Sequence, residues 1–365
     1  MGATHDNFVT MNVFAAPLPP AVVQFGRILL IDDGSSLDGA AYKVYDDRQE
    51  AVDDNDANEL SDHGLAAVEA ALVEGASDIA VASMDSSGGD DYVGVLQDIR
   101  DSDLDYMIVC IDSREAADIV AVSGEVETHV LSANADYEFF VFQSADSDLL
   151  ESGADLPAAL SDADDQDWTA GRFHDDDEAV SEVEWAANRG RFNLDATSPT
   201  WEGPMRDGTP LVDSITSSQR SNLLDKNIAV GLPQAEEQVV VAEGVTTSGR
   251  PIYEQFTEAW FVIRSHREMN RVRVQYQDRG EKIPLNRTGQ QIVRGVVDKF
   301  IGIGEEAGHF DSIQHGEVRD DGEDSLIQFP DITDEDIAER RLRCNVKVWF
   351  EVDALRFTFN IFFQR

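Results

Sequence analysis

Apolar residues in the first half of the chain switch repeatedly between two periods. The run "FGRILLIDD" at 25–33 is nearly continuous and ends in two acids, which predicts a buried strand. A helical spacing followed by a strand-like run then recurs three times, over 63–84, 91–112 and 114–143. In the first of these segments, Gly75 marks the expected end of the helix. Helices and strands in alternation predict an α/β layer with mostly parallel strands.

The stretches around these elements lack a clear period. Residues 46–58 are acidic and predict a linker, and residues 144–188 are rich in aspartate, which predicts loop and exposed surface. Residues 1–24 contain scattered apolar side chains and a cluster of prolines at 17, 19 and 20. Because proline excludes a regular helix there, this segment is expected to form an extended arm.

Two long helices are predicted in the second half of the chain. The first has one apolar face and is expected to pack on a sheet; that face comprises Tyr253, Phe256, Trp260 and Ile263. The second is expected to begin at a capping-box pattern, Thr288 followed by Gln291, and to end at Gly302 and Gly304. Its apolar stripe comprises Ile292, Val293, Val296, Val297, Phe300 and Ile301.

The C-terminal stretch has the pattern of a strand that needs a partner. Apolar and polar residues alternate over 346–353, which is typical of a half-buried strand. Beyond Ala354, the apolar residues take one strand face, namely Phe357, Phe359, Ile361 and Phe363. A strand of this kind would aggregate if it were left unpaired at an edge. Residues 354–365 are therefore expected either to pair with another copy of the chain or to complete the sheet of their own domain.

The charge balance is extreme. The chain has 365 residues, of which 72 are acidic and 28 are basic, and its formal net charge is −44. In molar salt the Debye length falls to about 3 Å, which screens this self-repulsion, so the composition favours an extreme halophile or a virus of one. An acidic mimic of nucleic acid is the less favoured alternative, because the acids surround apolar-periodic segments instead of forming one block. Direct binding of nucleic acid would require clustered Lys and Arg.

The acidic residues are distributed unevenly. Residues 1–200 hold 44 acidic and 8 basic side chains, whereas residues 201–365 hold 28 and 20. Residues 1–200 are therefore expected to face a solvent of high salt concentration, and residues 201–365 are expected to contact a partner.

The sequence offers little catalytic or metal-binding chemistry. Cys110 and Cys344 lie in separate apolar runs and are expected to be buried. His309 and His315 flank Asp311 without the spacing of a metal site, and aspartates 175–177 fit a solvated surface better than a divalent-ion site. No nucleophile motif and no phosphate-binding loop is present, so an enzyme is not expected. No apolar stretch is long enough to predict a membrane span.

One resemblance fails on its chemistry. The run "ILLIDD" (28–33) is similar to the first strand of a response-regulator receiver domain, and "DIAVASMD" (78–85) is similar to the strand that carries the phospho-accepting aspartate. A receiver also needs a lysine after its last strands. This chain has no lysine between Lys43 and Lys226, so the sequence argues against a receiver.

Four further segments contain short sequence motifs that follow one another in a fixed order along the chain. They are "SITSSQRSNLLDKNIAVG" (214–231), "VAEGVTTSGRPIYEQFTEAWFVIRSHREMNRV" (241–272), "KIPLNRTGQQIVRGVVDKFIGIGEEAGHF" (282–310) and "FPDITDEDIAERRLRCNVKVWFEVDALRFTFNIF" (329–362). In this order they resemble the C-terminal half of the contractile-tail sheath proteins of tailed viruses and related injection machines. Residues 42–84 also resemble the sheath segment that leads into the inserted domain. Leu285, Asn286 and Arg287 depart from the family's tyrosine-threonine-aspartate, which leaves the subfamily open.

The resemblance implies a multidomain α/β fold and a structural role. It implies an N-terminal arm at 1–24, an inner sheath core at 25–45 plus 190–353, an inserted acidic outer α/β domain at 46–189, and a C-terminal arm strand at 354–365. Copies of such a chain polymerise helically around a tail tube and contract to drive the tube through the host envelope. No cofactor is implied. A sheath subunit of a cell-encoded injection system is an alternative, and a flavodoxin-like enzyme is a more remote one.

The resemblance also implies two sets of contact residues. Basic residues on and before the second long helix would face the tail tube, namely Lys282, Arg287, Arg294 and Lys299. For Arg294 the alternative is an ordinary helical ion pair with Asp298. The arms would pair with neighbouring subunits, through Phe8, Val9, Val13 and Phe14 in the N-terminal arm and through Leu355, Phe357, Phe359, Ile361 and Phe363 in the C-terminal arm.

The partners implied by the resemblance are proteins. They are further copies of the chain in stacked rings, the tail tube protein, and the baseplate and tail terminator proteins, with no nucleic acid and no membrane insertion. The implied location is the tail of a virion that is assembled in the host cytoplasm.

Overall fold

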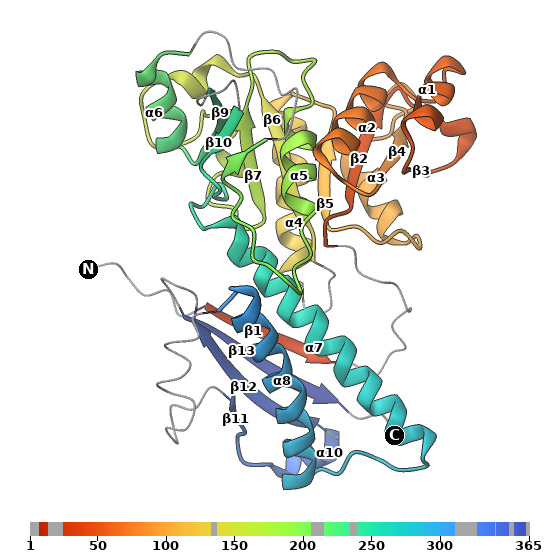
Figure 1. Cartoon of the computed structure of the whole chain (residues 1–365), viewed down its shortest axis with the longest axis vertical. Helices are drawn as coiled ribbons and strands as arrows, with labels where there is room; N and C mark the ends of the chain where they lie inside the picture. The colour runs from red at the N-terminus through yellow and green to blue at the C-terminus, as the bar shows by residue number, and fades with distance from the viewer. Residues whose placement is uncertain are drawn as a thin grey trace. The chain divides into compact units, whose positions relative to one another are not determined.

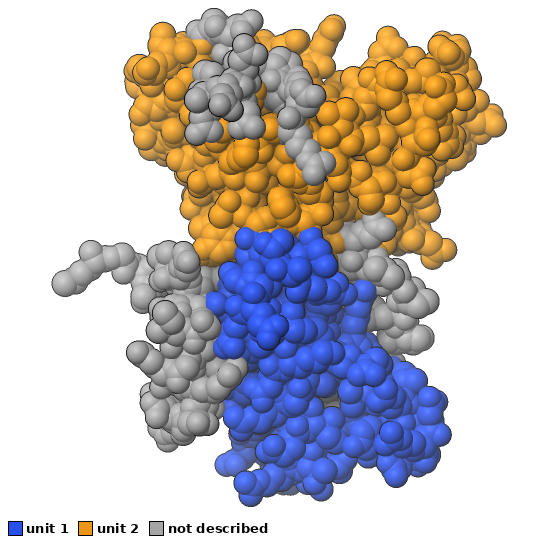
Figure 2. All heavy atoms as spheres, viewed as in Figure 1, with its two compact units in different colours: residues 1–21, 193–198, 256–365 blue, residues 22–192, 199–255 orange. Residues whose placement is uncertain are grey.

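The chain forms two compact units, which Figure 2 distinguishes by colour. Unit 1 comprises residues 1–21, 193–198 and 256–365, and unit 2 comprises residues 22–192 and 199–255. The computed structural model describes residues 7–13, 25–132, 137–205, 215–233, 239–310, 327–339, 341–349 and 354–362 (Figure 1). Each unit is thus assembled from segments that lie far apart in the sequence.

Unit 2 is built on one sheet, whose described strands follow the order β3-β4-β2-β5-β6-β7-β9-β10-β8. Their bounds are Ile28–Asp33 (β2), Tyr42–Tyr45 (β3), Ile79–Met84 (β4), Ile108–Ile111 (β5), Phe139–Ser144 (β6), Thr169–Phe173 (β7), Gly203–Pro204 (β8), Ile228–Pro233 (β9) and Val239–Ala242 (β10). The strands from β4 to β9 in this order run parallel, and β3, β10 and β8 are antiparallel additions at the two edges. The predicted α/β fold with mostly parallel strands is confirmed.

Helices cover both faces of this sheet (Figure 1). Helices α2 (Asp62–Glu74) and α5 (Ser181–Gly190) pack together on one face, and α3 (Tyr92–Arg100) and α4 (Ala116–Val130) pack together on the other. The order β4-β2-β5 is that of a doubly wound sheet, and it makes a switch point between β2 and β5. The other described helices of unit 2 are α1 (Arg48–Asp56) and α6 (Ser217–Asp225), with short 3-10 turns at Leu37–Gly39, Ser147–Leu150 and Ser161–Ala163.

Local signals fix both ends of α2. The Ser61 side chain accepts a hydrogen bond from the Gly64 backbone N–H at 2.8 Å, which satisfies a free donor of the first turn. Gly75 ends the helix with a φ of 102°, a left-handed conformation that favours glycine, as the sequence predicted.

Two segments that were predicted to lack structure contain regular elements. Residues 46–58 include α1, which buries only Ala51 and so shows little helical amphipathicity. Residues 144–188 include β7 and most of α5, and every residue of β7 is buried. The prediction of loop and exposed surface was wrong here, because charged residues such as Arg172 and Glu182 are 1% and 0% exposed.

Unit 1 contains a second sheet, whose described strands follow the order β1-β13-β12-β11. Their bounds are Asn7–Val13 (β1), Ile327–Gln328 (β11), Arg341–Trp349 (β12) and Ala354–Phe362 (β13). Helix α7 (Ile252–Asp278) begins in unit 2 and continues into unit 1, and α8 (Arg287–Ala307) and α10 (Asp334–Glu339) contact β12. Every second residue of β12 from Leu342 is apolar and at most 1% exposed, namely Leu342, Cys344, Val346 and Val348.

Helix α8 has the predicted stripe but different ends. Val293, Val297 and Ile301 are fully buried. The helix begins after Asn286, whose side chain accepts from the Thr288 N–H at 2.9 Å, so the predicted capping box at Thr288 is wrong. The predicted end at Gly302 and Gly304 is also wrong, because the helix continues to Ala307. At Gly304 an added Cβ would lie 2.5 Å from the Phe310 ring, so this glycine serves packing.

The compact units differ from the predicted domain boundaries. The prediction grouped residues 25–45 with residues 190–353, but β2 is hydrogen-bonded on both sides within the sheet of unit 2, to β4 and to β5. Residues 199–255 supply α6, β8, β9 and β10 to the same unit. Among the described residues, no helix is both long and apolar enough to cross a membrane.

Candidate interaction surfaces

Strand β13 lies between two other strands of the same chain. Its antiparallel partner is β12, and its parallel partner is β1. In this register Val9 stands opposite Phe357, and Phe357 stands opposite Val346, which is 1% exposed. The predicted arm residues that occupy rows of this apolar face are Val9, Val13, Leu355, Phe357, Phe359 and Ile361. Phe8 stands in the alternate set of rows, and Phe14 and Phe363 lie outside the described residues.

This register has a direct consequence for the arms. In the described residues, a single chain forms this sheet from its own strands, so residues 354–362 adopt the second of the two arrangements expected for the C-terminal segment. Pairing of these strands with another copy stays a prediction.

The four basic residues predicted to face a partner lie on α8 or just before it. Lys282 and Arg287 are exposed at its start. The Arg294 guanidinium lies 3.8 Å from the Asp298 carboxylate, so the expected helical pair is present. The Lys299 ammonium lies 3.2 Å from the carboxylate of Glu268 on α7. Because exposed ion pairs contribute little to stability, these cations can exchange their partners at small cost.

Glu268 is shared by two cations. Its carboxylate accepts two hydrogen bonds from Arg271 at 2.7 and 2.6 Å, and one from Lys299. The Arg271 hydrogen bonds, with a smaller contribution from Lys299, lower the pKa of Glu268 to about 2. One carboxylate therefore compensates two positive charges, and this part of α7 and α8 keeps a net positive charge.

A buried aromatic cluster fixes α7 within unit 1. The Trp260 indole donates to Asp195 at 2.8 Å, and the guanidinium of Arg264 forms two hydrogen bonds to the same carboxylate. The His309 ring stacks on Trp260 with ring centroids 4.7 Å apart. Its Nε2 donates to the Leu194 carbonyl at 2.6 Å, and its Nδ1 accepts from Thr257. Both ring nitrogens of His309 are thus used inside the fold.

Carboxylates gather at the C-terminal ends of β2 and β5, at the switch point of unit 2. Asp32 is fully buried and accepts from the hydroxyls of Ser35 and Ser61. Asp112 accepts from the Asp33 backbone N–H at 3.0 Å and from the Tyr92 hydroxyl at 2.6 Å. Among the described residues, no group of three or more His, Cys, Asp and Glu side chains is arranged to hold a metal ion. The cluster is therefore best explained by hydrogen bonds within the fold.

Asp32 gives a pH-dependent prediction. Burial raises the pKa of its carboxyl from 3.8 to about 6, so between these pH values the folded state binds a proton that the unfolded state releases. The wild-type chain should therefore lose stability as pH rises through this window. Asp32→Asn is expected to raise the free energy of unfolding by up to about 3 kcal/mol at pH 8 and by little at pH 4. Denaturant titrations of both chains at several pH values measure this, and a pH-independent difference would contradict it.

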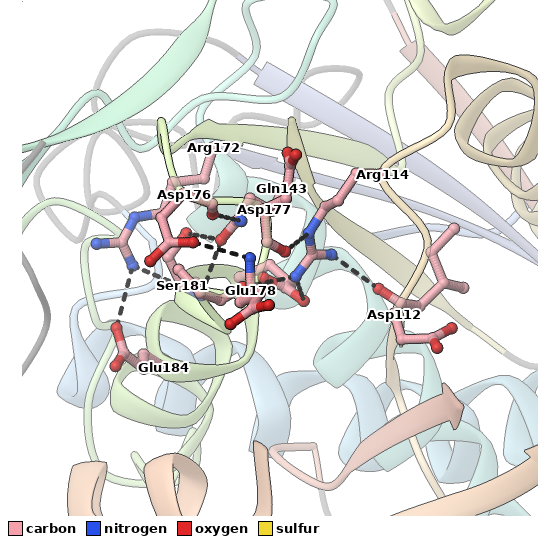
Figure 3. A network of polar contacts seen from close by, with 12 residues as sticks. Asp112, Arg114, Gln143, Arg172, Asp176, Asp177, Glu178, Ser181 and Glu184 are labelled. Carbon is pink, nitrogen blue, oxygen red and sulfur yellow. Dashed lines mark hydrogen bonds and ion pairs between the residues drawn. The ribbon is translucent and has the colours of Figure 1, made fainter. Parts of the chain in front are cut away.

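A buried polar network holds α5 and the loop before it (Figure 3). The Arg114 guanidinium donates to the carbonyls of Asp177 and Ala179 at 3.3 and 2.7 Å and pairs with Glu182 at 3.0 Å. Gln143 on β6 donates to the Asp176 carbonyl at 2.9 Å. These bonds use backbone carbonyls of the loop, and its acidic side chains stay exposed over residues 175–178. The loop thus presents four carboxylates from a fixed backbone.

Comparison with solved structures identifies the architecture. A chain of the baseplate structure of the anti-feeding prophage is 12% identical with a TM-score of 0.62, covering 96% of this chain and 92% of that chain. The contracted helical sheath of the same prophage is 12% identical with a TM-score of 0.59, covering 89% and 90%. A sheath tail protein of Listeria innocua is 11% identical with a TM-score of 0.53, covering 75% and 60%. Searches of the sequence against protein-family models and against curated proteins find no match. The chain therefore has the fold of contractile sheath proteins.

Proposed function

We propose that this chain is the sheath subunit of a contractile tail, that its copies polymerise helically around a tail tube, and that contraction drives the tube through the host envelope. The observation that carries the proposal is the likeness in fold to the contracted sheath of the anti-feeding prophage over 89% of this chain. The motif order in residues 214–362 supports it independently. The role is structural, and the proposed partners are further copies, the tube, the baseplate and the terminator.

The terminal strands supply the ties between copies. In one chain, β1 and β13 already pair along seven residues of parallel register. If β1 or β13 of one copy takes the same place in the sheet of another copy, the same backbone hydrogen bonds form, so the exchange costs little free energy. Four apolar side chains of β13 contribute about 6–12 kcal/mol when they are buried. Such ties can hold subunits together while the rest of each subunit moves.

Contraction in this proposal is a rigid-body repacking of subunit interfaces. Unit 2 carries 50 acidic and 12 basic residues, whereas unit 1 carries 22 and 16. This split supports an outward position for the acidic part of the chain and an inward position for α8. Lys282, Arg287, Arg294 and Lys299 would then face tube carboxylates.

The acidic composition supports a virus that infects haloarchaea, because a chain of net charge −44 is suited to molar salt. A cell-encoded injection system is the second candidate, since the anti-feeding prophage supplies two of the structural likenesses. Neighbouring genes separate the two: genes for a capsid and a terminase indicate a virus, and their absence beside tube and baseplate genes indicates an injection system.

Negative-stain microscopy of the purified chain in molar salt tests the proposal. We expect striated tubes of uniform width that sediment at moderate speed. A chain that stays monomeric at every salt and protein concentration, with or without a tube protein, would contradict a sheath function.

A further inference from the structure

The last turns of α7 carry an exposed basic surface that core packing does not explain. From Asn270 to Asp278 no residue of α7 is buried, although the preceding part of the helix buries Trp260 and Met269. Nine residues of helix extend for about 13 Å. Val274 is 45% exposed there, which makes it one of the few large apolar side chains at the surface of the described residues.

This end of α7 is positively charged in a strongly acidic chain. Residues 264–279 hold five basic and two acidic side chains. Arg271 is 59% exposed and shares its carboxylate partner with Lys299. At Arg273, the atoms Nε and Nη1 are buried and meet no hydrogen-bond partner among the described residues. Nη2 is not among these buried atoms, so a carboxylate brought by another molecule can pair with the guanidinium at that nitrogen.

We infer that the end of α7, residues 270–278, docks on the acidic surface of unit 2 of a second copy of this chain. Charge complementarity favours this occupant, since unit 2 has 38 more acidic than basic residues. Every neighbouring copy of the chain presents such an acidic unit. The exposed loop at 175–178 is the most concentrated part of that surface with a fixed backbone. A fixed loop loses little conformational entropy on binding, which makes it the preferred contact.

This inference rests on the proposed sheath function, because it requires copies to lie side by side. It assigns to α7 a role different from that of α8: α8 would face the tube, and the end of α7 would face a neighbouring subunit. The two roles are separable, because they predict cross-links to different proteins.

Zero-length amine-to-carboxylate cross-linking can identify the partner, because the chain has only five lysines. Arg273→Lys keeps the charge and places an amine at the site. Assembled tubes are made from an equal mixture of ¹⁵N-labelled and unlabelled copies, and the cross-linked peptides are identified by mass spectrometry. We expect cross-links from position 273 to unit 2 carboxylates that join labelled to unlabelled peptides.

Arg48→Lys is the matched control. Arg48 lies in unit 2, its side chain is 67% exposed, and it lies 2.7 Å from Glu69 of its own chain. It should therefore give cross-links within one copy, in peptides of a single label. Cross-links from position 273 that reach only tube carboxylates, only unit 1, or only its own copy would overturn the inference while leaving the sheath function intact. Failure of the wild-type chain to form tubes would overturn both.

Arg273→Glu adds a second measurement. It replaces a favourable contact with a like-charge contact, and we expect it to raise the protein concentration needed for assembly by at least about tenfold. Arg48→Glu makes the same charge change in unit 2 and should leave that concentration within about twofold of wild type. Equal assembly of the two variants would contradict the inference.

Discussion

A chain with Val9→Pro and Thr10→Pro is expected to remain a folded monomer and to lose assembly. Proline has no N–H to donate. Successive N–H groups of a strand point to opposite edges, so one of any two consecutive residues donates toward β13. The pair of prolines therefore interrupts the parallel register between β1 and β13, in which these residues stand opposite Phe357 and Thr358. If the same pairing ties neighbouring copies, the loss of about 3 kcal/mol per tie raises the concentration needed for assembly by at least about a hundredfold.

The control keeps the backbone donors and changes the same positions. Val9→Ala with Thr10→Ala retains both N–H groups and should assemble far better than the proline variant. Sedimentation and negative-stain microscopy measure assembly, and denaturant unfolding measures the stability of unit 2, which should be the same in all three chains. Normal tubes from the proline variant would rule out β1 as a tie between copies.

Most of the parallel sheet of unit 2 could be predicted from the sequence. The three helix-then-strand repeats between residues 63 and 143 correspond to α2 and β4, α3 and β5, and α4 and β6. These elements could be predicted because their apolar residues recur with the period of a helix or a strand. Signals such as Gly75 also mark their ends. The pairing order of the strands could not be predicted from the sequence. Strand β2 pairs with both β4 and β5, and no local pattern of residues specifies which strands lie next to each other.

Strand β7 and helix α5 were missed for one physical reason. Both bury charged and amide side chains that a sequence analysis assigns to the surface. Arg172 is 1% exposed on β7, and its guanidinium donates to the Ser181 carbonyl. Arg114 similarly compensates Glu182, which is fully buried. Burial of such residues depends on partners distant in the chain, so no local pattern reveals it.

The basic surface on α8 was predictable in position but not in partners. The basic character of α8 follows from its sequence, but the contact of Lys299 with Glu268 depends on how α7 and α8 pack. The end of α7 was missed as a surface because its apolar face from Tyr253 to Ile263 suggested a core helix throughout. The local signal was the run of basic residues beyond Met269, where Arg271 and Arg273 flank Val272.

A close contact between two glycines gives the largest stability prediction. Gly26 precedes β2, and Gly190 is the last residue of α5. A Cβ added at Gly26 would lie 1.7 Å from the carbonyl oxygen of Gly190, and this neighbour is backbone that cannot rotate away. The requirement comes from the close approach of the two segments, because the φ of Gly26 is not in the left-handed region. Gly26→Ala must separate α5 from the start of β2 and is expected to cost about 3 kcal/mol or more of the unfolding free energy.

The same substitution elsewhere provides an internal control of opposite sign. Gly124 lies within α4, and an added Cβ there meets nothing within 4 Å. Gly124→Ala should therefore stabilise the chain by up to about 1 kcal/mol, because alanine loses less conformational entropy in a helix. Denaturant unfolding followed by tryptophan fluorescence reports on unit 2 through the buried Trp185 and Trp201. Since α5 lies on the faces of β2, β5 and β6, a Gly26→Ala chain as stable as wild type would show that α5 does not hold this position against the sheet.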